Sequence, residues 1–250
     1  MPGVIGQWWV HYRTVTSTND LARAAAQRGA PEGLVITADY QTQGRGRRGR
    51  EWWAPRKKNL LWSVVLYPPR RPEYLGLLTL LAGAAAARAV RVVTGLPSGL
   101  KWPNDLWLSG QKLGGVLAEA AIGGNDWQWA VVGIGLNVNP TGEEFPPELQ
   151  GQATSLQQVL GREVPRETLR TRLEEEFSAL YECFRRGEDE AILAAWQALD
   201  VTQGREVEIT TPQGRLCGRV LGVDPKGALE LLDPAGRCHR IIMGEVTLRW

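Results

Sequence analysis

The chain contains 250 residues, of which 43% are hydrophobic and 22% are charged, and its formal net charge at pH 7 is +2. This length allows one large domain, or a main domain with a small one attached, and the composition is ordinary for a soluble globular protein. The net charge is too small for the whole chain to bind nucleic acid as a polycation, so any anion-binding site must be local.

The cysteines and the apolar segments predict a cytoplasmic protein without a membrane span. Cys183, Cys217 and Cys238 are odd in number and lack CxxC or metal-finger spacing, so we expect reduced thiols. The N-terminus shows no basic segment followed by an apolar one, and therefore no secretory signal. The longest apolar run, residues 75–87, is too short to cross a bilayer and predicts a buried helix.

In chain order, the first half of the sequence predicts strands and two helices. Strands are expected over residues 8–15, 33–40 and 60–67, and helices over 21–29 and 72–95. Ser17 and Asp20 form a signal for the start of the first helix, and Gly29 is a natural stop. Pro72 opens the second helix and Gly95 closes it.

The second half predicts three more strands, a helical region and a change of character after Asp200. The three strands are expected over residues 100–108, 112–122 and 127–139, and helices over 165–199. Five short strands punctuated by glycine turns are expected over residues 205–210, 215–223, 228–233, 237–243 and 245–250. These elements predict an α+β fold, with a mixed sheet carrying helices on one face over 1–200 and a small β-barrel over 201–250.

A glycine- and arginine-rich segment, residues 44–59 (GRGRRGREWWAPRKKN), contains seven basic side chains and one acidic one. Its glycines let backbone amides approach an anion, and arginine forks suit carboxylate or phosphate. It is not a P-loop, and Arg50 stands where a dinucleotide-binding loop would place its third glycine. Taken alone, the segment fits an RNA-binding region as well as a small-molecule anion site.

Two further segments favour the small-molecule site. Lys101-Trp102-Pro103-Asn104-Asp105 places a cation, an amide and a carboxylate beside a proline that interrupts a strand pattern. Lys112 follows seven residues later, just before Gly114 and Gly115. Either lysine alone is most simply a solvated surface cation, but together with the basic loop they indicate a local anion site.

Four short motifs of the sequence occur together in one characteristic order. TSTN, GRGRRGREW, KWPNDL with KLGGVL, and GIGLN occur in the order and at the spacings of the biotin protein ligases, or biotin–[biotin carboxylase] ligases, which the chain closely resembles from about Tyr12 to Trp250. GRVLGVDPKGALEL and GEVTLR are similar to the small SH3-like domain of that family. The resemblance implies activation of biotin by ATP to biotinyl-5′-AMP, followed by transfer to a lysine of a biotin carboxyl carrier protein.

The resemblance also implies roles for single residues. The implied biotin-binding residues are Ser17, Thr18, Asn19, Gln41, Arg45, Gly46, Arg47, Lys112, Gly114 and Gly115. The implied ATP-binding residues are Arg45, Arg47, Arg50, Trp52, Asn104, Lys112 and Asn137, although Trp53 competes with Trp52 for the aromatic position. The implied catalytic residues are Arg47, Lys112 and Asp105, and Asp105 either orients Lys112 or holds Mg²⁺. His11 and His239 match no family position and are expected to be structural.

Two alternatives stay open beside this interpretation. A lipoate–protein ligase has a similar fold and the same adenylate chemistry, and an RNA-binding protein would use the basic loop directly. Bifunctional family members carry an N-terminal winged-helix domain, but here TSTN already begins at Thr16, so we expect the ligase-only form without specific DNA binding. The sequence leaves the identity of the carrier and the existence of a homodimer open.

Overall fold

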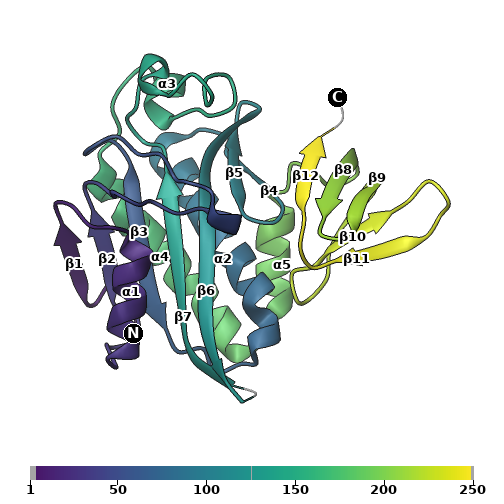
Figure 1. Ribbon diagram of the computed structural model, residues 1–250, viewed down its shortest axis with the longest axis horizontal. Coiled ribbons are helices and arrows are strands. Elements are labelled where there is room, and N and C mark those ends of the chain that lie inside the picture. The colour runs from purple at the N-terminus through teal and green to yellow at the C-terminus, as the bar shows by residue number, and fades with distance from the viewer. Residues whose placement is uncertain (1–3, 125, 249–250) are drawn as a thin grey trace.

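The computed structural model describes residues 4–124 and 126–248, and its largest element is a seven-stranded mixed sheet (Figure 1). The strands are β1 (Trp9–Tyr12), β2 (Val35–Ala38), β3 (Leu60–Leu66), β4 (Gly99–Lys101), β5 (Asp105–Leu108), β6 (Gln111–Gly123) and β7 (Asp126–Leu136). Their order across the sheet is β1-β2-β3-β7-β6-β5-β4. Only β1 and β2 pair in parallel, and the other neighbours are antiparallel.

Helices cover both faces of this sheet unequally. They are α1 (Thr18–Gln27), α2 (Leu75–Thr94), α3 (Leu156–Leu160), α4 (Arg166–Arg186) and α5 (Asp189–Gln197). Figure 1 shows α2, α4 and α5 behind the sheet and α1 in front of it. Ala22 and Ala26 of α1 pack on Val65 and Val131, whose neighbours in the strands face α2 and α4. The predicted α+β class is confirmed, with α1 as an addition on the second face.

Helix α2 is the centre of the core. Residues Pro72–Thr94 are long and apolar enough to cross a membrane by length and composition, but 67% of the relevant window is buried inside the protein. The helix is apolar on nearly all sides because it is covered by α4, α5 and β6. Gly95, with φ of 73°, ends it in the left-handed conformation. The prediction of a buried helix at residues 75–87 is therefore correct.

Local structure departs from the sequence-based expectation at three places. Residues 100–108 form a hairpin of β4 and β5 instead of one strand, because Pro103 has no N–H to offer to a continuous ladder. Helix α1 begins at Thr18, directly after Ser17 as the helix-start signal predicted, but the Ser17 side chain forms no capping hydrogen bond. The short helix α3 had no clear signal in the sequence.

The C-terminal region forms a second sheet of five antiparallel strands. These are β8 (Glu206–Thr211), β9 (Gly214–Val223), β10 (Leu229–Leu232), β11 (Cys238–Ile241) and β12 (Glu245–Leu248), in the order β11-β10-β9-β8-β12. Within the described residues β11 and β12 are the two open edges, so the strands form a curved sheet whose hydrogen-bond ladder does not close into the expected barrel. Residues 249 and 250 of the expected last strand lie outside the described part.

The C-terminal sheet packs tightly against the main body. Val207 and Leu229 belong to the same apolar core as the residues of α2. The buried indole of Trp102 donates a hydrogen bond to the carbonyl of Gly227, with 3.0 Å between the two atoms. The turn around Gly227 lies so close to α2 that a Cβ on Gly76 would come within 2.5 Å of the carbonyl oxygen of Lys226. The second sheet is thereby fixed beside the turn between β4 and β5.

Candidate active site

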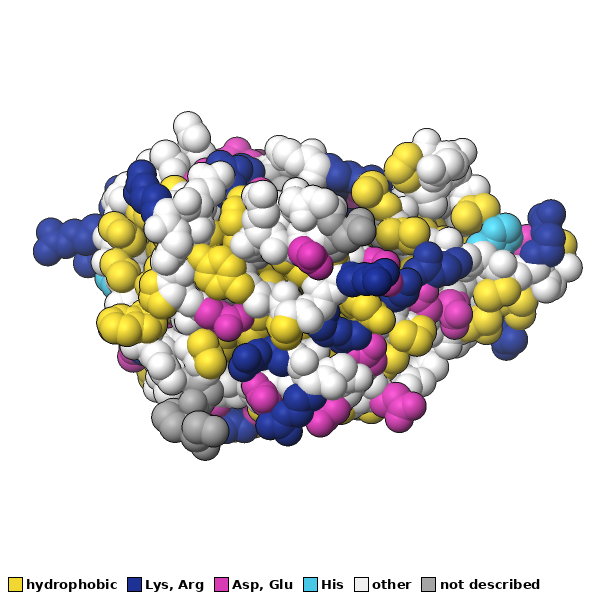
Figure 2. Space-filling model, turned by 90° about the horizontal axis from the view of Figure 1, so that it is seen from below, with side chains coloured by type: hydrophobic (Ala, Val, Ile, Leu, Met, Phe, Trp, Pro, Cys, Tyr) yellow, Lys and Arg dark blue, Asp and Glu magenta, His cyan; other side chains and the backbone are white. Residues whose placement is uncertain are grey.

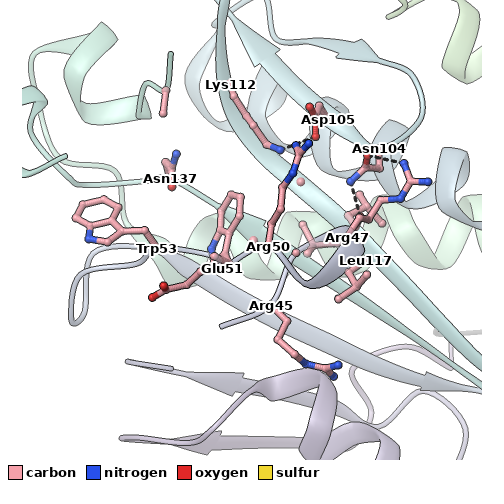
Figure 3. A pocket seen from close by; sticks show the side chains of 18 of the residues that line it. Arg45, Arg47, Arg50, Glu51, Trp53, Asn104, Asp105, Lys112, Leu117 and Asn137 are labelled. Carbon is pink, nitrogen blue, oxygen red and sulfur yellow. Dashed lines mark hydrogen bonds and ion pairs between the residues drawn. The ribbon is translucent and has the colours of Figure 1, made fainter. Parts of the chain in front are cut away.

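A cavity of about 570 Å³ lies on the α1 face of the main sheet and extends to residues 244–246 of the C-terminal sheet. Its floor comes from β3, β6 and β7, whose residues 61–62, 115–117 and 133–135 line it. The basic loop runs across it (Figure 3). The volume is that of a typical small-molecule site. All the sequence-predicted site residues except one line this cavity.

The exception is Gly114. It is a residue of β6 that does not line the cavity. A Cβ at this position would lie 2.7 Å from the carbonyl oxygen of Gly135 and 2.6 Å from a methyl carbon of Leu136. The glycine is therefore needed for packing between β6 and β7, and the expectation that it contacts a ligand is corrected. Its neighbour Gly115 does line the cavity.

One end of the cavity is a buried network of neutral polar groups. Gln41 Oε1 accepts hydrogen bonds from the amide of Thr18 at 2.7 Å and from its hydroxyl at 3.0 Å. Ser63 Oγ lies 2.7 Å from Asn19 Oδ1 and 2.8 Å from the Thr18 hydroxyl. Ser17 lines the same end. Buried amides and hydroxyls held in this way can offer both donors and acceptors to a polar, uncharged ligand group.

Sequence reasoning missed two members of this network. Ser63 is the one polar residue of β3, which is otherwise entirely apolar, and that interruption was an available signal. Glu119 accepts a hydrogen bond of 2.9 Å from Asn19 Nδ2, but it lies 100 residues away in the sequence. Close backbone packing supports the arrangement, because a Cβ at Gly133 would lie 2.0 Å from Asn19 Oδ1.

Arg45 joins this neutral end rather than the opposite one. Its guanidinium donates to Asp20 at 2.6 Å and to Glu119 at 3.3 Å. Figure 3 shows the side chain directed away from Lys112 and Asp105. Two carboxylates therefore neutralise its charge, and the phosphate contact inferred from the sequence is not prepared in this conformation. Gly46, the next residue, lines the cavity.

The other end of the cavity is strongly cationic. Lys112 Nζ lies 2.6 Å from Asp105 Oδ1, and Figure 3 shows the pair beside Arg50. Asp105 begins β5 and Lys112 lies near the start of β6, where a register shift next to Leu106 brings the two side chains together. Five cations and two carboxylates interact in this region: Arg47, Arg48, Arg50, Lys101 and Lys112 with Asp105 and Glu245. This group therefore carries three excess positive charges.

Burial shifts the titration of two of these cations. The pKa of Lys101 is lowered, mainly because burial disfavours the ammonium form, although Asp105 opposes the shift. The pKa of Arg47 is likewise lowered by burial and by the neighbouring Arg48. Lys101 lies in the KWPND motif, but the sequence did not predict it as a site residue. An anionic ligand bound here would stabilise the charged forms of Lys101 and Arg47 and would compensate in part for the water that burial removes from them.

The side-chain amides of Asn104 and Asn137, which were predicted to bind the nucleotide, form hydrogen bonds within the protein. Asn137 Oδ1 accepts from Asn59 at 3.0 Å, and its Nδ2 donates to the carbonyl of Thr154 at 3.1 Å. Asn104 Oδ1 accepts from Arg47 at 3.1 Å, and its Nδ2 donates to the carbonyl of Val116 at 2.9 Å. Both residues line the cavity, so each retains free hydrogen-bonding capacity beside a structural function.

The structure separates the two tryptophans of the loop. The ring of Trp52 lies over Gly135, and its centroid is 5.9 Å from Lys112 Nζ. Trp53 packs instead against Phe145, with 5.1 Å between ring centroids. Both line the cavity, and Trp52 is the one that lies near Lys112.

The remaining candidate residues lie elsewhere. His11 contacts Thr37 on β2, and His239 contacts Asp233 in the C-terminal sheet, so neither lines the cavity. Across residues 4–124 and 126–248, no group of three or more His, Cys, Asp or Glu side chains could hold a metal ion.

Comparisons with known proteins agree with this geometry. The pattern of the biotin/lipoate A/B protein ligase family matches residues 10–137, and that of the biotin protein ligase C-terminal domain matches residues 202–249. A biotin–[acetyl-CoA-carboxylase] ligase of Mycobacterium tuberculosis is 36% identical over 237 residues, covering 92% of this chain and 85% of the relative. A bifunctional ligase/repressor of Bacillus spizizenii is 31% identical, over 98% of this chain and 75% of its own length. The solved structure of the Aquifex aeolicus biotin protein ligase with biotin and ATP superimposes with a TM-score of 0.83 at 28% identity, covering 97% and 99% of the two chains.

Proposed function

The chain belongs to the biotin/lipoate A/B protein ligase family, and we propose that it activates biotin with ATP and passes the biotinyl group to a lysine of a carrier protein. The family resemblance predicted from the sequence motifs is confirmed, and so is the ligase class. The names of the relatives and the bound ligands of the similar structure favour biotin over lipoate. The RNA-binding alternative is not supported by any of these relatives.

The neutral end of the cavity fits the ureido group of biotin. A ureido group carries two N–H donors and one carbonyl acceptor, and it has no charge. The side chains of Thr18, Asn19 and Gln41 present matching acceptors and donors. Ser63 orients Thr18 and Asn19, and Thr18 in turn holds Gln41. We assign biotin recognition to this end, with Ser17 and the backbone at Gly46 and Gly115 as further walls. Arg45 supports Asp20 and Glu119 around it.

The cationic end fits the reacting groups. A biotin carboxylate oxygen attacks the α-phosphorus of ATP, and the bond to the bridging oxygen breaks as pyrophosphate leaves with its electron pair. Two anions must approach, and negative charge builds up on the α-phosphate. Lys112, which Asp105 orients, supplies fixed positive charge at this point, and fixed charge of this kind is the usual means of stabilising such a transition state. Arg47, bound to Asn104, holds the basic loop over the adenylate that results.

The nucleotide is placed by the remaining predicted residues. We propose that Trp52 packs against the adenine ring and that Arg50 binds the phosphates. Asn104 and Asn137 hold the neighbouring protein segments in place through their hydrogen bonds. Mg²⁺ enters as part of the ATP substrate, and Asp105 is the carboxylate that would complete its coordination. Mg²⁺ commonly uses one or two carboxylates beside substrate phosphates, so the donor set fits this mode of binding.

In the second step the acceptor lysine enters the same cavity. Its neutral amine attacks the acyl carbon of the mixed anhydride, AMP leaves, and the amine loses a proton. The basic loop must keep water from the anhydride until then, because hydrolysis would waste it. We propose a biotin carboxyl carrier domain as the acceptor, since the relatives are named for acetyl-CoA carboxylase.

Specific DNA binding is not part of this proposal. In the basic segment, Arg45, Arg47 and Arg50 are each engaged by another side chain of the protein. On the face in Figure 2, Lys and Arg side chains lie beside Asp and Glu side chains without a continuous basic surface. A fluorescence titration near physiological salt, comparing a biotin-gene promoter with scrambled DNA, should show equal and weak affinities. Tighter promoter binding would reveal a second function.

Three organisational points complete the proposal. We place the boundary between a catalytic domain and a C-terminal domain after Asp200. The outer edge of β1, where Trp9 and Tyr12 are exposed, is the part of the described surface that supports a homodimer. Light scattering over a range of protein concentrations tests this, and a monomer throughout would contradict it. Cys183, Cys217 and Cys238 form no disulfide, which supports a cytoplasmic location.

One observation carries the proposed function: a hydrogen-bonding end and an end with excess positive charge, which includes Lys112, share a single cavity, and Trp52 lies beside Lys112 in it. Incubation with biotin, ATP and Mg²⁺ should yield biotinyl-5′-AMP and pyrophosphate without any carrier protein. Mass spectrometry detects the adenylate directly. Parallel reactions with lipoate in place of biotin should yield none, and the reverse result would assign the chain to the lipoate branch.

A further inference from the structure

The basic loop has one anchor in the C-terminal sheet. Arg50 donates two hydrogen bonds to the carboxylate of Glu245, with Nη1 2.8 Å from Oε1 and Nη2 bound to Oε2. Glu245 is the first residue of β12 and lines the cavity together with Gly244 and Val246. The two partners are 195 residues apart in sequence. Paired forks of this kind fix orientation as well as distance.

The loop needs such anchors because its own hydrogen bonds are few. Outside the short 3-10 turn at Arg47–Gly49, the backbone bonds within residues 44–52 run from Gly46 to Arg50, from Arg50 to Arg47 and from Trp52 to Gly44. Arg48 adopts φ of 57° and ψ of 31°, a left-handed conformation that costs about 1–2 kcal/mol in a residue with a side chain. The loop is therefore held in this conformation by contacts with other parts of the protein.

Side chains supply three of these contacts. Arg45 binds Asp20 and Glu119, and Arg47 binds Asn104, all of which belong to the main body of the protein. Among these side-chain hydrogen bonds, that of Arg50 is the one that reaches the C-terminal sheet. Its bond to Glu245 joins the end of the loop to a separate sheet that packs on α2.

We propose that Glu245 is a positioning residue for the reaction: through Arg50, it holds the basic loop across the cavity, and release of this pair accompanies loop opening. The C-terminal domain thereby contributes to retention of the adenylate without touching it. This consequence for the adenylate rests on the proposed function, whereas the effect of Glu245 on the loop does not.

The strength of the pair suits a reversible latch. The side chains of Arg50 and Glu245 are 63% and 45% exposed, so water and salt screen their attraction. Exposed pairs of this kind change an equilibrium by up to about fivefold. The hydrogen bonds from Arg50 also lower the pKa of Glu245, so its carboxylate is ionised at neutral pH. Lys101 and Arg48 face the same carboxylate and act in the same direction.

Hydrogen exchange of the ligand-free protein tests the latch. In Glu245→Gln, the backbone amides of residues 44–51 should exchange about fivefold faster than in the wild type, because the neutral amide retains the shape but loses the charge. The matched control is Glu73→Gln, which removes the other ion pair to the C-terminal sheet, that between Glu73 and Lys226 at 2.7 Å with similar exposure. It should leave exchange of the loop unchanged. Equal effects of the two variants, or no effect of Glu245→Gln, would overturn the proposal.

A charge reversal provides the second measurement. Arg50→Glu and Glu245→Arg should each accelerate exchange of the loop, and the double variant should restore protection, because the pair is then rebuilt in the opposite sense. Failure of the double variant to recover any protection counts against the latch. Release of free adenylate by Glu245→Gln, measured beside total adenylate formed, tests the functional consequence. If the wild type formed no adenylate at all, the proposed function would fail while the exchange result would still decide the latch.

Discussion

The indole ring of Trp52 lies directly on the backbone of Gly135, so that a Cβ added to the glycine would come within 2.6 Å of the ring. Gly135 belongs to the GIGLN motif of β7, and Trp52 to the basic loop. Because Gly135 has no side chain, the ring of Trp52 can lie against the backbone of the sheet. This contact ties two distant motifs into one wall of the cavity.

Gly135→Ala should displace Trp52 without unfolding the protein. Overpacking of this kind typically costs about 1–3 kcal/mol. We expect the KM for ATP in the adenylation reaction to rise roughly tenfold, with a smaller change in the KM for biotin. Gly115→Ala is the matched comparison, because its Cβ would meet Trp52 and Lys112 only at 3.7 Å, an ordinary contact distance. Equal effects of the two alanines would show that the position of Trp52 does not govern nucleotide binding.

Lys112→Ala should slow adenylate formation by about 10²–10³-fold, the scale observed when one preorganised charge-stabilising group is removed. Lys112→Arg should not restore the rate, because the planar guanidinium cannot take the place of a compact ammonium 2.6 Å from Asp105. Single-turnover measurement of biotinyl-5′-AMP gives the rate directly. A Lys112→Ala variant with nearly the wild-type rate would return this residue to the class of solvated surface cations.

The sequence predicted the parts of the site that lie in short continuous motifs. Lys112 and Asp105 are seven residues apart, so their motifs could be read together, and both line the cavity. The sequence did not predict those features of the site that depend on the tertiary fold. Gly114 and Gly115 are neighbours in one motif, but only Gly115 lines the cavity, because Gly114 packs closely against Gly135 and Leu136 of β7.

Long-range partners explain the other differences. Arg45 was expected among phosphate ligands, but Glu119, 74 residues away, helps to hold it at the opposite end of the cavity. Glu245 had no local signal, because its role depends on a contact with Arg50 that only the packing of the second sheet creates. Propensity and motif spacing do not contain such information.

Arg47→Gly should affect retention of the adenylate more than its formation. The change removes the 3.1 Å hydrogen bond to Asn104 and adds backbone freedom next to Arg48. We expect formation within a fewfold of the wild type, but more free biotinyl-5′-AMP in solution and indiscriminate biotinylation of added bystander protein. Arg56→Gly is the control, because Arg56 follows in the same segment but packs on Tyr40 outside the cavity. If Arg47→Gly forms no adenylate, Arg47 acts in the first chemical step instead.

The lowered pKa of Lys101 predicts that the activity falls at alkaline pH. Burial lowers its pKa below the usual 10.5, against the opposing effect of Asp105 and with a smaller contribution from Lys112 in the same direction. Glu245 also faces it and favours the charged form. If the ammonium helps to bind the phosphates of ATP, kcat/KM for ATP must fall as the pH rises through this lowered pKa. In Lys101→Arg the guanidinium stays protonated and can still stack on Trp107, so the fall should begin at higher pH.

Stability must change in the opposite direction over the same interval, which separates the effect of Lys101 from general alkaline unfolding. Because the lysine binds its proton less tightly in the folded than in the unfolded state, its contribution to the free energy of unfolding increases from the folded pKa up to the unfolded one. Denaturant unfolding of the wild type and of Lys101→Met, at several pH values between 7 and 10, measures this difference. The wild type should gain stability relative to Lys101→Met as the pH rises, while its kcat/KM for ATP falls. A parallel loss of both quantities, or an alkaline fall that Lys101→Arg does not move, would exclude Lys101 as the titrating group.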